Sequence, residues 1–168
     1  MDELDSAIVE QLQRDGRQTN RDLARRLGVA PSTCLERVRL LRRRGVIRGF
    51  TAQVDLGALG RHVQALVAVQ VRPLSSKVIN DFHDSVTGLP EVLAVFLLAG
   101  GDDLVVHVAV HDVEHLRAFL LDRFSQRREI VSFRTSVVFQ HSANTVVTPA
   151  VPSPGPSRVG HRPDWTVS

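Results

Sequence analysis

The sequence predicts an α+β protein, with a helical N-terminal part followed by a part that alternates strands with helices. Up to Gly45, apolar residues recur every three or four positions, which is the spacing of one helix face. From His62 onward, apolar residues alternate at the two-residue spacing of a strand, and two helical segments interrupt that pattern. The change of period between these two residues predicts two domains.

Three helices are expected in the N-terminal part. The first covers about residues 4–16, and the second is capped by Thr19 and ends in a turn at Gly28. The third begins at Pro31, because the missing N–H of proline costs nothing in the first turn of a helix. Its predicted buried stripe consists of Leu35, Val38 and Leu41.

A short helix, a glycine turn and an arginine-rich helix predict a helix-turn-helix, whose second helix enters the major groove of DNA. Charge supports this interpretation. Residues 1–50 hold eleven arginines against seven acids, whereas residues 51–168 hold ten basic residues against eleven acids. The alternatives are a solvated basic helix and the arginine usage of a GC-rich genome. The residues predicted to contact DNA are Ser32, Thr33, Glu36, Arg37, Arg39, Arg42 and Arg43.

Residues 46–54 are predicted to form a strand or wing, which completes a winged helix-turn-helix domain over residues 1–54. Residues 55–61 contain two glycines and are predicted to be a hinge. Residues 62–141 are predicted to repeat the order strand-helix-strand. That order gives a split βαβ, or ferredoxin-like βαββαβ, sheet with both helices on one face. The strands are expected at 62–71, 91–100, 103–110 and 130–141, and the helices after the caps Ser75 and Asp112.

The second predicted strand is apolar on both faces between Val92 and Leu98. With both helices on one side of an open sheet, the other side meets water unless something covers it. A second copy of the sheet is the simplest cover, so the pattern predicts a homodimer. Residues 142–168 are rich in proline and poor in apolar residues, which predicts a disordered tail.

Composition excludes several classes of protein. No stretch reaches the roughly 18 apolar residues that a membrane span needs. The acidic, amphipathic N-terminus is not typical of a signal peptide, so a soluble, cytoplasmic protein without membrane partners is expected. The single cysteine, Cys34, excludes an intrachain disulfide and a cysteine-built zinc site, and it is expected in the core.

Candidate catalytic and metal sites are weak. His107, His111 and His115 are spaced four apart, but they are expected to lie on a strand, a loop and a helix start, which is a poor arrangement for a metal. Asp102 and Asp103 are adjacent in an extended segment, so their side chains are expected to point to opposite faces. No metal, no cofactor, no catalytic residue and no enzymatic activity are therefore predicted.

Four strings, LDSAIVEQLQRDGR, CLERVRLL, GVIRGFTA and AGGDDLVVHV, resemble the Lrp/AsnC (feast/famine) family of transcription regulators. The resemblance covers about residues 2–141 without large gaps. It implies a DNA-binding N-terminal domain joined to a ferredoxin-like effector and assembly domain. It also implies dimers that assemble further, commonly to octamers, and transcription control by an amino acid or a similar metabolite.

The chain departs from the family pattern at two points. Relatives often have serine at the cap of the recognition helix, where this chain has Ala30; Ser32 offers a replacement if the helix starts later. Relatives often have Gly-Asp-aromatic-Asp at the effector turn. The predicted effector-binding residues here are Gly100, Gly101, Asp102 and Asp103, so the first acid and the aromatic are missing.

The sequence therefore predicts a sequence-specific DNA-binding transcription regulator, and the resemblance implies that an amino acid or related metabolite modulates it. The two glycines would expose backbone N–H groups to a carboxylate, and Asp102 or Asp103 would accept an ammonium group. One alternative is an architectural DNA-binding protein without a ligand. Another is an enzyme similar to siroheme decarboxylases, which the run Arg42-Arg43-Arg44 disfavours.

Overall fold

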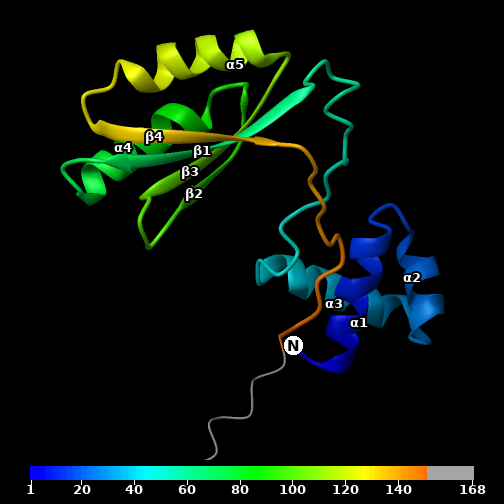
Figure 1. Ribbon diagram of the computed structural model, residues 1–168. Helices are drawn as coiled ribbons and strands as arrows, with labels where there is room; N and C mark the ends of the chain where they lie inside the picture. Colours follow the sequence, from blue (N-terminus) through cyan, green and yellow to red (C-terminus); the bar gives the residue numbers. More distant parts are fainter. Residues whose placement is uncertain (151–168) are drawn as a thin grey trace, which may run out of the picture. The chain divides into compact units, whose positions relative to one another are not determined.

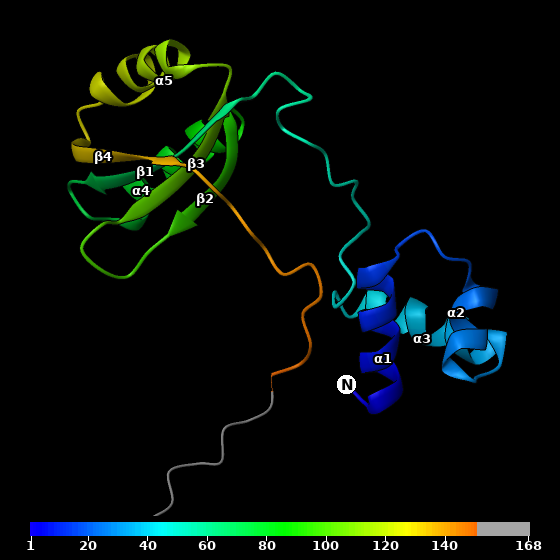
Figure 2. The same ribbon diagram turned by 45° about the vertical axis from the view of Figure 1, so that its right-hand side comes forward.

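The computed structural model describes residues 1–150 and resolves two compact units (Figure 1). Of the described residues, the first unit comprises Met1–Thr51 together with residues 143–150, and the second comprises Ala52–Ser142. Between α3 and β1 the chain forms neither helix nor strand; this linker is the cyan-to-green segment of Figure 2. Each unit has a hydrophobic core of its own.

The N-terminal unit contains three helices: α1 (Glu3–Arg14), α2 (Asn20–Leu27) and α3 (Pro31–Arg43). Thr19 caps α2 by accepting a hydrogen bond from the Asp22 N–H at 3.1 Å. Gly28 ends α2 in the left-handed conformation (φ 67°), which glycine adopts without steric cost. The core of this unit consists of the buried residues Ile8, Leu23, Ala24, Cys34 and Leu41.

The predicted buried stripe of α3 is wrong at one position. Leu35 is 37% exposed, whereas Cys34 is fully buried. Cys34, Val38 and Leu41 lie at the spacing i, i+4, i+7, so they share one face, and Leu35 is turned about 100° away from it. Packing against α1 and α2 selects the face that contains the smaller cysteine side chain.

The beginning of α3 has no side-chain cap. The helix starts at Pro31 with Ala30 in the cap position, and no side chain accepts a capping hydrogen bond from the N–H groups of its first turn. The predicted replacement by Ser32 is therefore wrong, because the helix does not start later. Instead, the Asn20 side chain donates a hydrogen bond to the Pro31 carbonyl at 2.8 Å, which holds the beginning of α2 against the beginning of α3.

The predicted wing strand is absent, since residues 46–54 form neither strand nor helix. A strand requires a neighbour for its N–H and C=O groups, and no other segment of the described chain pairs with this one. Two apolar residues of the segment still contact the helices. Ile47 packs against the core, and Phe50 lies against Gly16.

The second unit is the predicted four-stranded antiparallel sheet with helices. Its strands are β1 (Val63–Val71), β2 (Val92–Leu97), β3 (Leu104–Val110) and β4 (Ile130–Val138). Its helices are α4 (Ser76–Thr87) and α5 (Val113–Leu120), the latter continued by the π-helical turn η1 (Leu121–Ser125). The strand order is β2-β3-β1-β4, which the labels of Figure 1 follow from bottom to top. This is the ferredoxin-like arrangement.

Both helices cover the same face of the sheet. Alternate residues of β1 and β3 form this face and are fully buried. The Phe82 ring of α4 lies 5.9 Å from the Phe124 ring of η1, and Phe119 of α5 lies 5.7 Å from Phe124, so the two helical segments share one aromatic cluster. Ser75 and Asp112 cap α4 and α5 as predicted.

The opposite face of the sheet carries a mixture of apolar and polar side chains. Paired residues of neighbouring strands point to the same side, so Ala94 and Phe96 of β2 share this face with His107 and Val105 of β3. Phe96 is 50% exposed. Val95, by contrast, packs against the core. Only Val92 and Val95 of β2 thus pack against the core, whereas Leu93, Phe96 and Leu97 are exposed.

The chain from Ala143 to residue 150 contacts the N-terminal unit. The Gln13 side chain donates to the Val147 carbonyl and accepts from the Val147 N–H, each at 2.8 Å. This part of the predicted disordered tail contains no helix or strand but is bonded to α1. The rest of the predicted tail, residues 151–168, lies outside the described residues.

Candidate DNA-binding and effector sites

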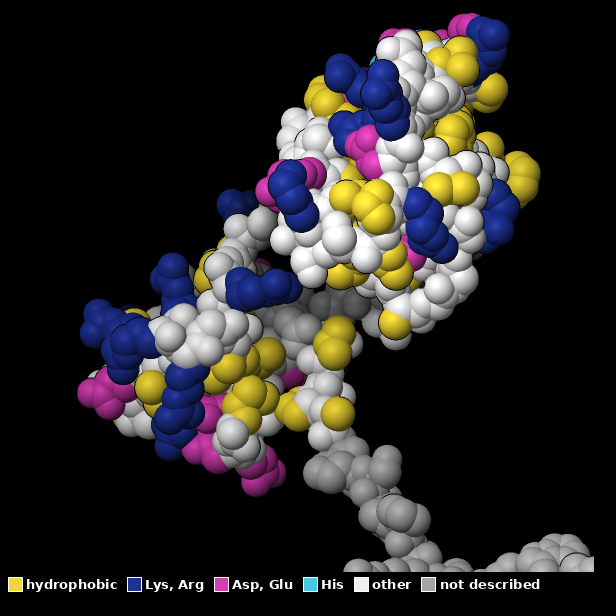
Figure 3. All heavy atoms as spheres, turned by 90° about the vertical axis from the view of Figure 1, so that its left-hand side faces the viewer, with side chains coloured by type: hydrophobic (Ala, Val, Ile, Leu, Met, Phe, Trp, Pro, Cys, Tyr) yellow, Lys and Arg dark blue, Asp and Glu magenta, His cyan; other side chains and the backbone are white. Residues whose placement is uncertain are grey.

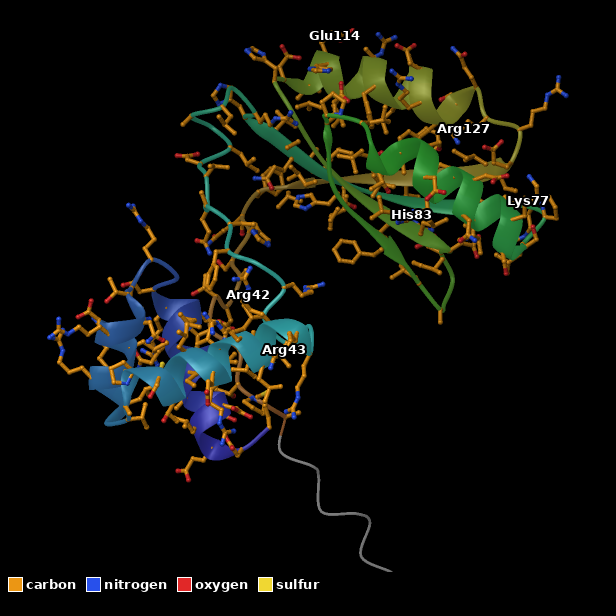
Figure 4. All side chains as sticks on the ribbon, turned by 180° about the vertical axis from the view of Figure 1, so that it is seen from behind. Arg42, Arg43, Lys77, His83, Glu114 and Arg127 are labelled. Atoms are coloured by element: carbon orange, nitrogen blue, oxygen red, sulfur yellow. The ribbon has the colours of Figure 1, made fainter. Side chains whose placement is uncertain are left out.

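One face of α3 presents a stripe of exposed polar and basic residues. The stripe consists of Ser32, Glu36, Arg39 and Arg43, at the spacing i, i+4, i+7, i+11. Because the core residues of α3 lie on the opposite side of the helix, these four side chains point away from the unit. Arg42 lies beside the stripe and is also exposed; Figure 4 labels it with Arg43. We call Ser32, Glu36, Arg39 and Arg43 the recognition stripe.

Arg37 has a different environment from the other arginines of α3. Its guanidinium lies 2.5 Å from the Asp2 carboxylate and 3.2 Å from the Asp5 carboxylate. Asp5 is only 2% exposed and also completes a capping box with Asp2 at the beginning of α1. Arg37 therefore joins α3 to α1 and is directed away from the recognition stripe.

The charges at this contact are mutually stabilised. The Asp5 N–H donates to the Asp2 carboxylate at 2.8 Å, and this bond together with the Arg37 guanidinium lowers the pKa of Asp2. The Asp2 side chain, in turn, is the first cause of a raised pKa for Arg37. Asp2 and Arg37 therefore remain ionised at neutral pH, and Arg37 also contacts the nearly inaccessible Asp5 side chain.

Exposed basic side chains also lie outside α3, at positions that are not among the predicted DNA contacts. Arg26 of α2 and Arg48 after α3 are exposed, and no carboxylate among the described residues pairs with either. Arg25, by contrast, is paired with Asp22 at 2.5 Å. Figure 3 shows dark-blue basic side chains gathered on one side of the N-terminal unit. In the sequence, these arginines are indicated only by the excess of positive charge in residues 1–50.

The predicted effector turn connects β2 to β3. The Leu98 N–H donates to the Asp103 carbonyl at 2.9 Å, which closes the turn. Gly100 and Gly101 have open space where a side chain would be, and neither needs a positive φ. The turn is therefore exposed, but its backbone conformation does not require glycine at these two positions.

Both acids of this turn already bind groups of the chain. The Asp103 carboxylate accepts from the Val71 N–H at 2.8 Å and lies 3.2 Å from the Arg72 guanidinium. The Asp102 carboxylate lies 2.7 Å from the Arg134 guanidinium of β4. The two side chains thus reach different strands, as expected for adjacent extended residues, and they do not form a pair that shares a proton.

The remaining candidates for chemistry are separate in space and environment. His107 lies on the outer face of β3 beside Gln64 at 3.1 Å, and burial lowers its pKa. Burial raises the pKa of the Cys34 thiol, so this cysteine is not activated. Within residues 1–150 no cluster of three or more potential ligands is suited to a metal ion. The same part of the chain contains no helix long and apolar enough to span a membrane.

A helix-turn-helix followed by a ferredoxin-like domain is the arrangement of a DNA-binding regulator with a ligand-binding domain. Residues 1–48 match the winged helix-turn-helix DNA-binding model, and residues 64–147 match the Lrp/AsnC ligand binding domain. The chain belongs to the Lrp/AsnC family of transcription regulators, as the resemblance predicted.

Individual relatives support this assignment over most of the chain. The HTH-type transcriptional regulator AldR of Mycolicibacterium smegmatis is 38% identical over 141 residues, which cover 84% of this chain and 82% of that protein. The transcriptional regulator AzlB of Bacillus subtilis is 34% identical over 149 residues, covering 89% and 95%. A Neisseria meningitidis transcriptional regulator, solved as a complex with L-Met, superposes with a TM-score of 0.81 at 30% identity, covering 89% and 96%.

Proposed function

We propose that this regulator binds specific DNA sites through the recognition stripe of α3. The observation that carries the proposal is the alignment of Ser32, Glu36, Arg39 and Arg43 on the face opposite the core. The short Ser32 and the carboxylate of Glu36 can form hydrogen bonds with base edges. Arg39 and Arg43 can bind guanine or phosphate. Thr33 and Arg42 flank the stripe as further contacts. Arg37 positions α3 by holding α1.

The test is a mobility-shift titration with DNA from the regulator's own promoter. Arg39→Ala is expected to weaken binding by about 1–3 kcal/mol if it contacts a base, and by less if it contacts phosphate. The matched control is Arg128→Ala, which removes the same charge from an exposed position in the second unit. Wild-type affinity is expected to fall steeply with salt. Equal binding by both variants would contradict the assignment of the stripe.

We propose further that a free amino acid modulates this binding at the turn around Gly100 and Gly101. The ligand-binding domain and the L-Met complex of a relative support an amino-acid effector. Since Asp102 and Asp103 are each bonded to an arginine, an arriving ammonium group competes with Arg134 or Arg72. Gly101→Val fills the open space at the turn without backbone strain. It is expected to abolish the amino-acid response and retain ligand-free DNA binding.

The protein is proposed to assemble through the outer face of its sheet, first as a homodimer and then as a larger oligomer such as an octamer. The exposed Phe96 supports this, since a second sheet would remove it from water. Phe96→Asp is expected to place an unpaired charge in the interface and dissociate the dimer. Val113→Asp, on an exposed position of α5, is the control. Light scattering measures both, and an unchanged mass for Phe96→Asp would contradict this interface.

No enzymatic activity is proposed, because the family consists of transcription regulators. A cytoplasmic location is proposed as well, because the proposed target of the protein is DNA. A purified sample without tetrapyrrole absorbance that shifts promoter DNA would eliminate the decarboxylase alternative. If no amino acid alters that shift, the ligand-independent architectural function replaces the proposed effector response.

A further inference from the structure

A hollow of about 260 Å³ lies in the second unit at the end of β3, away from the Gly100–Gly101 turn at its beginning. Four segments border it: the end of the linker, the turn before β2, the end of β3 and the first turn of α5. Its charged lining consists of Arg61 and Glu91, with two imidazoles, His111 and His115, at the rim. We call it the linker pocket.

The backbone of Ala109 brings the two opposite charges to the same edge of β3. Its carbonyl accepts from the Arg61 guanidinium at 2.9 Å, and its N–H donates to the Glu91 carbonyl at 2.8 Å. The N–H and C=O of one strand residue point to the same side, so Arg61 and Glu91 both lie on the β2 side of this residue. A basic and an acidic residue, Arg61 and Glu91, therefore both line the pocket.

Neither charge is saturated by the chain. Only Nη1 of Arg61 has a described partner, which is a neutral carbonyl, and no described carboxylate forms an ion pair with this arginine. Glu91 lies 3.5 Å from the His115 ring, which is a long contact for a charged pair. The Asp112 carboxylate already accepts the His115 N–H at 2.7 Å, so the beginning of α5 offers no competing anion site.

We propose that the linker pocket binds a small aliphatic α-amino acid. Its carboxylate bonds to the free guanidinium nitrogens of Arg61, and its ammonium group bonds to the Glu91 carboxylate. The exposed Pro90 supplies an apolar wall for the side chain. A simple anion satisfies only Arg61 and is repelled by Glu91, whereas a zwitterion satisfies both charges at once. This site is separate from the effector turn proposed above.

Binding there also acts on the chain that joins the two units. Arg61 follows Gly60, which has a positive φ of 73° and ends the linker. The Arg61 N–H donates to the Leu56 carbonyl at 2.8 Å, which closes the last linker turn. A ligand held by Arg61 therefore stabilises this turn together with the pocket.

Footprinting of histidines tests the site in the full-length protein. Diethyl pyrocarbonate modifies exposed imidazoles, and mass spectrometry resolves each modified residue. Saturating L-valine is expected to slow modification of His111 and His115 severalfold. His83 of α4, labelled in Figure 4, is the internal control and keeps its rate. L-alanine and L-leucine test the size of the apolar wall.

Matched ligands and variants test the carboxylate contact and the ammonium contact one at a time. The desamino analogue 3-methylbutanoate and the decarboxylated analogue isobutylamine are each expected to protect poorly. Glu91→Gln keeps the shape and the backbone bond but is expected to weaken L-valine binding by about tenfold or more. Arg61→Lys keeps the charge but loses the forked donor geometry, so it weakens binding less. Gly101→Val leaves the protection intact, because it changes only the turn at the other end of β3.

Three results would overturn the proposal: no protection by any of the three amino acids, equal protection by 3-methylbutanoate, or loss of protection in Gly101→Val. Either of the first two results would exclude recognition of a zwitterion in the linker pocket. The third result would show that the amino acid binds at the turn around Gly101 instead. DNA binding by wild type without added ligand is measured in the same preparations. Loss of protection with intact DNA binding thus counts against this pocket alone.

Discussion

The two units of this protein are stabilised by different interactions. The core of the second unit contains thirteen buried apolar residues, whereas that of the N-terminal unit contains five. The smaller unit adds the ion pairs of Arg37 with Asp2 and Asp5, which join α1 to α3. In the unit with the smaller core, the helices are also joined by charge contacts, and Arg37 is engaged in these contacts while Arg39 and Arg43 are exposed.

The largest effect is expected from the aromatic cluster of the second unit. Phe124 is fully buried against Phe82, Phe119 and Phe133. Phe124→Ala should lower the free energy of unfolding of this unit by about 3–5 kcal/mol. Phe139→Ala is the matched control, since Phe139 is 99% exposed, and it should change stability by less than about 0.5 kcal/mol. Hydrogen exchange resolved by peptide measures each unit separately; a similar loss in both variants would contradict the cluster's role.

The next effect concerns the ion pair of the N-terminal unit. Arg37→Ala leaves the nearly inaccessible Asp5 carboxylate without its cation, so the unfolding midpoint of this unit should fall by several degrees. Exchange protection should be lost in α1. Arg39→Ala removes the same charge from an exposed position and should leave stability unchanged while weakening DNA binding. The reverse pattern would show that Arg37, not Arg39, belongs to the recognition stripe.

The smallest effects are expected from pH, and they differ between the two units. Residues 1–51 contain no histidine, whereas burial lowers the pKa of His107 in the second unit. A depressed histidine pKa means that the unfolded state binds more protons, so stability falls as pH drops below about 6.5, the unperturbed value. Between pH 7 and 5 the second unit should lose stability through His107, and His107→Gln should remove that part. An unchanged slope in the variant would contradict it.

At acidic pH the N-terminal unit is expected to lose stability as well, through Asp2. The lowered pKa of Asp2 means that its contribution is present above about pH 4, the ordinary range of aspartate, and is lost as pH falls through the lower folded value. Exchange protection of α1 should therefore persist at pH 5 and decline below pH 4. High salt should weaken the same contact because it is partly exposed.

Much of the fold was predictable from the sequence because its signals are local. Thr19, Ser75 and Asp112 cap their helices through bonds that span three residues, and the two-residue period of β1 follows directly from strand geometry. The exposed positions Ser32, Arg39 and Arg43 were likewise included among the predicted DNA contacts. Helix spacing alone placed them outside the buried stripe.

Only the tertiary structure decided which of these local features meet. The carboxylates that bind Arg37 lie 32 and 35 residues away, and the partner of Asp102 lies 32 residues away, so no local pattern identifies them. The absent strand at residues 46–54 has the same origin, because a strand forms only where a second segment satisfies its backbone groups. Local signals were sufficient for most of the helices and strands and for the family, since these depend on neighbours along the chain. Packing decided that Cys34 is buried in place of Leu35 and that Arg37 contacts α1, because these outcomes depend on neighbours in space.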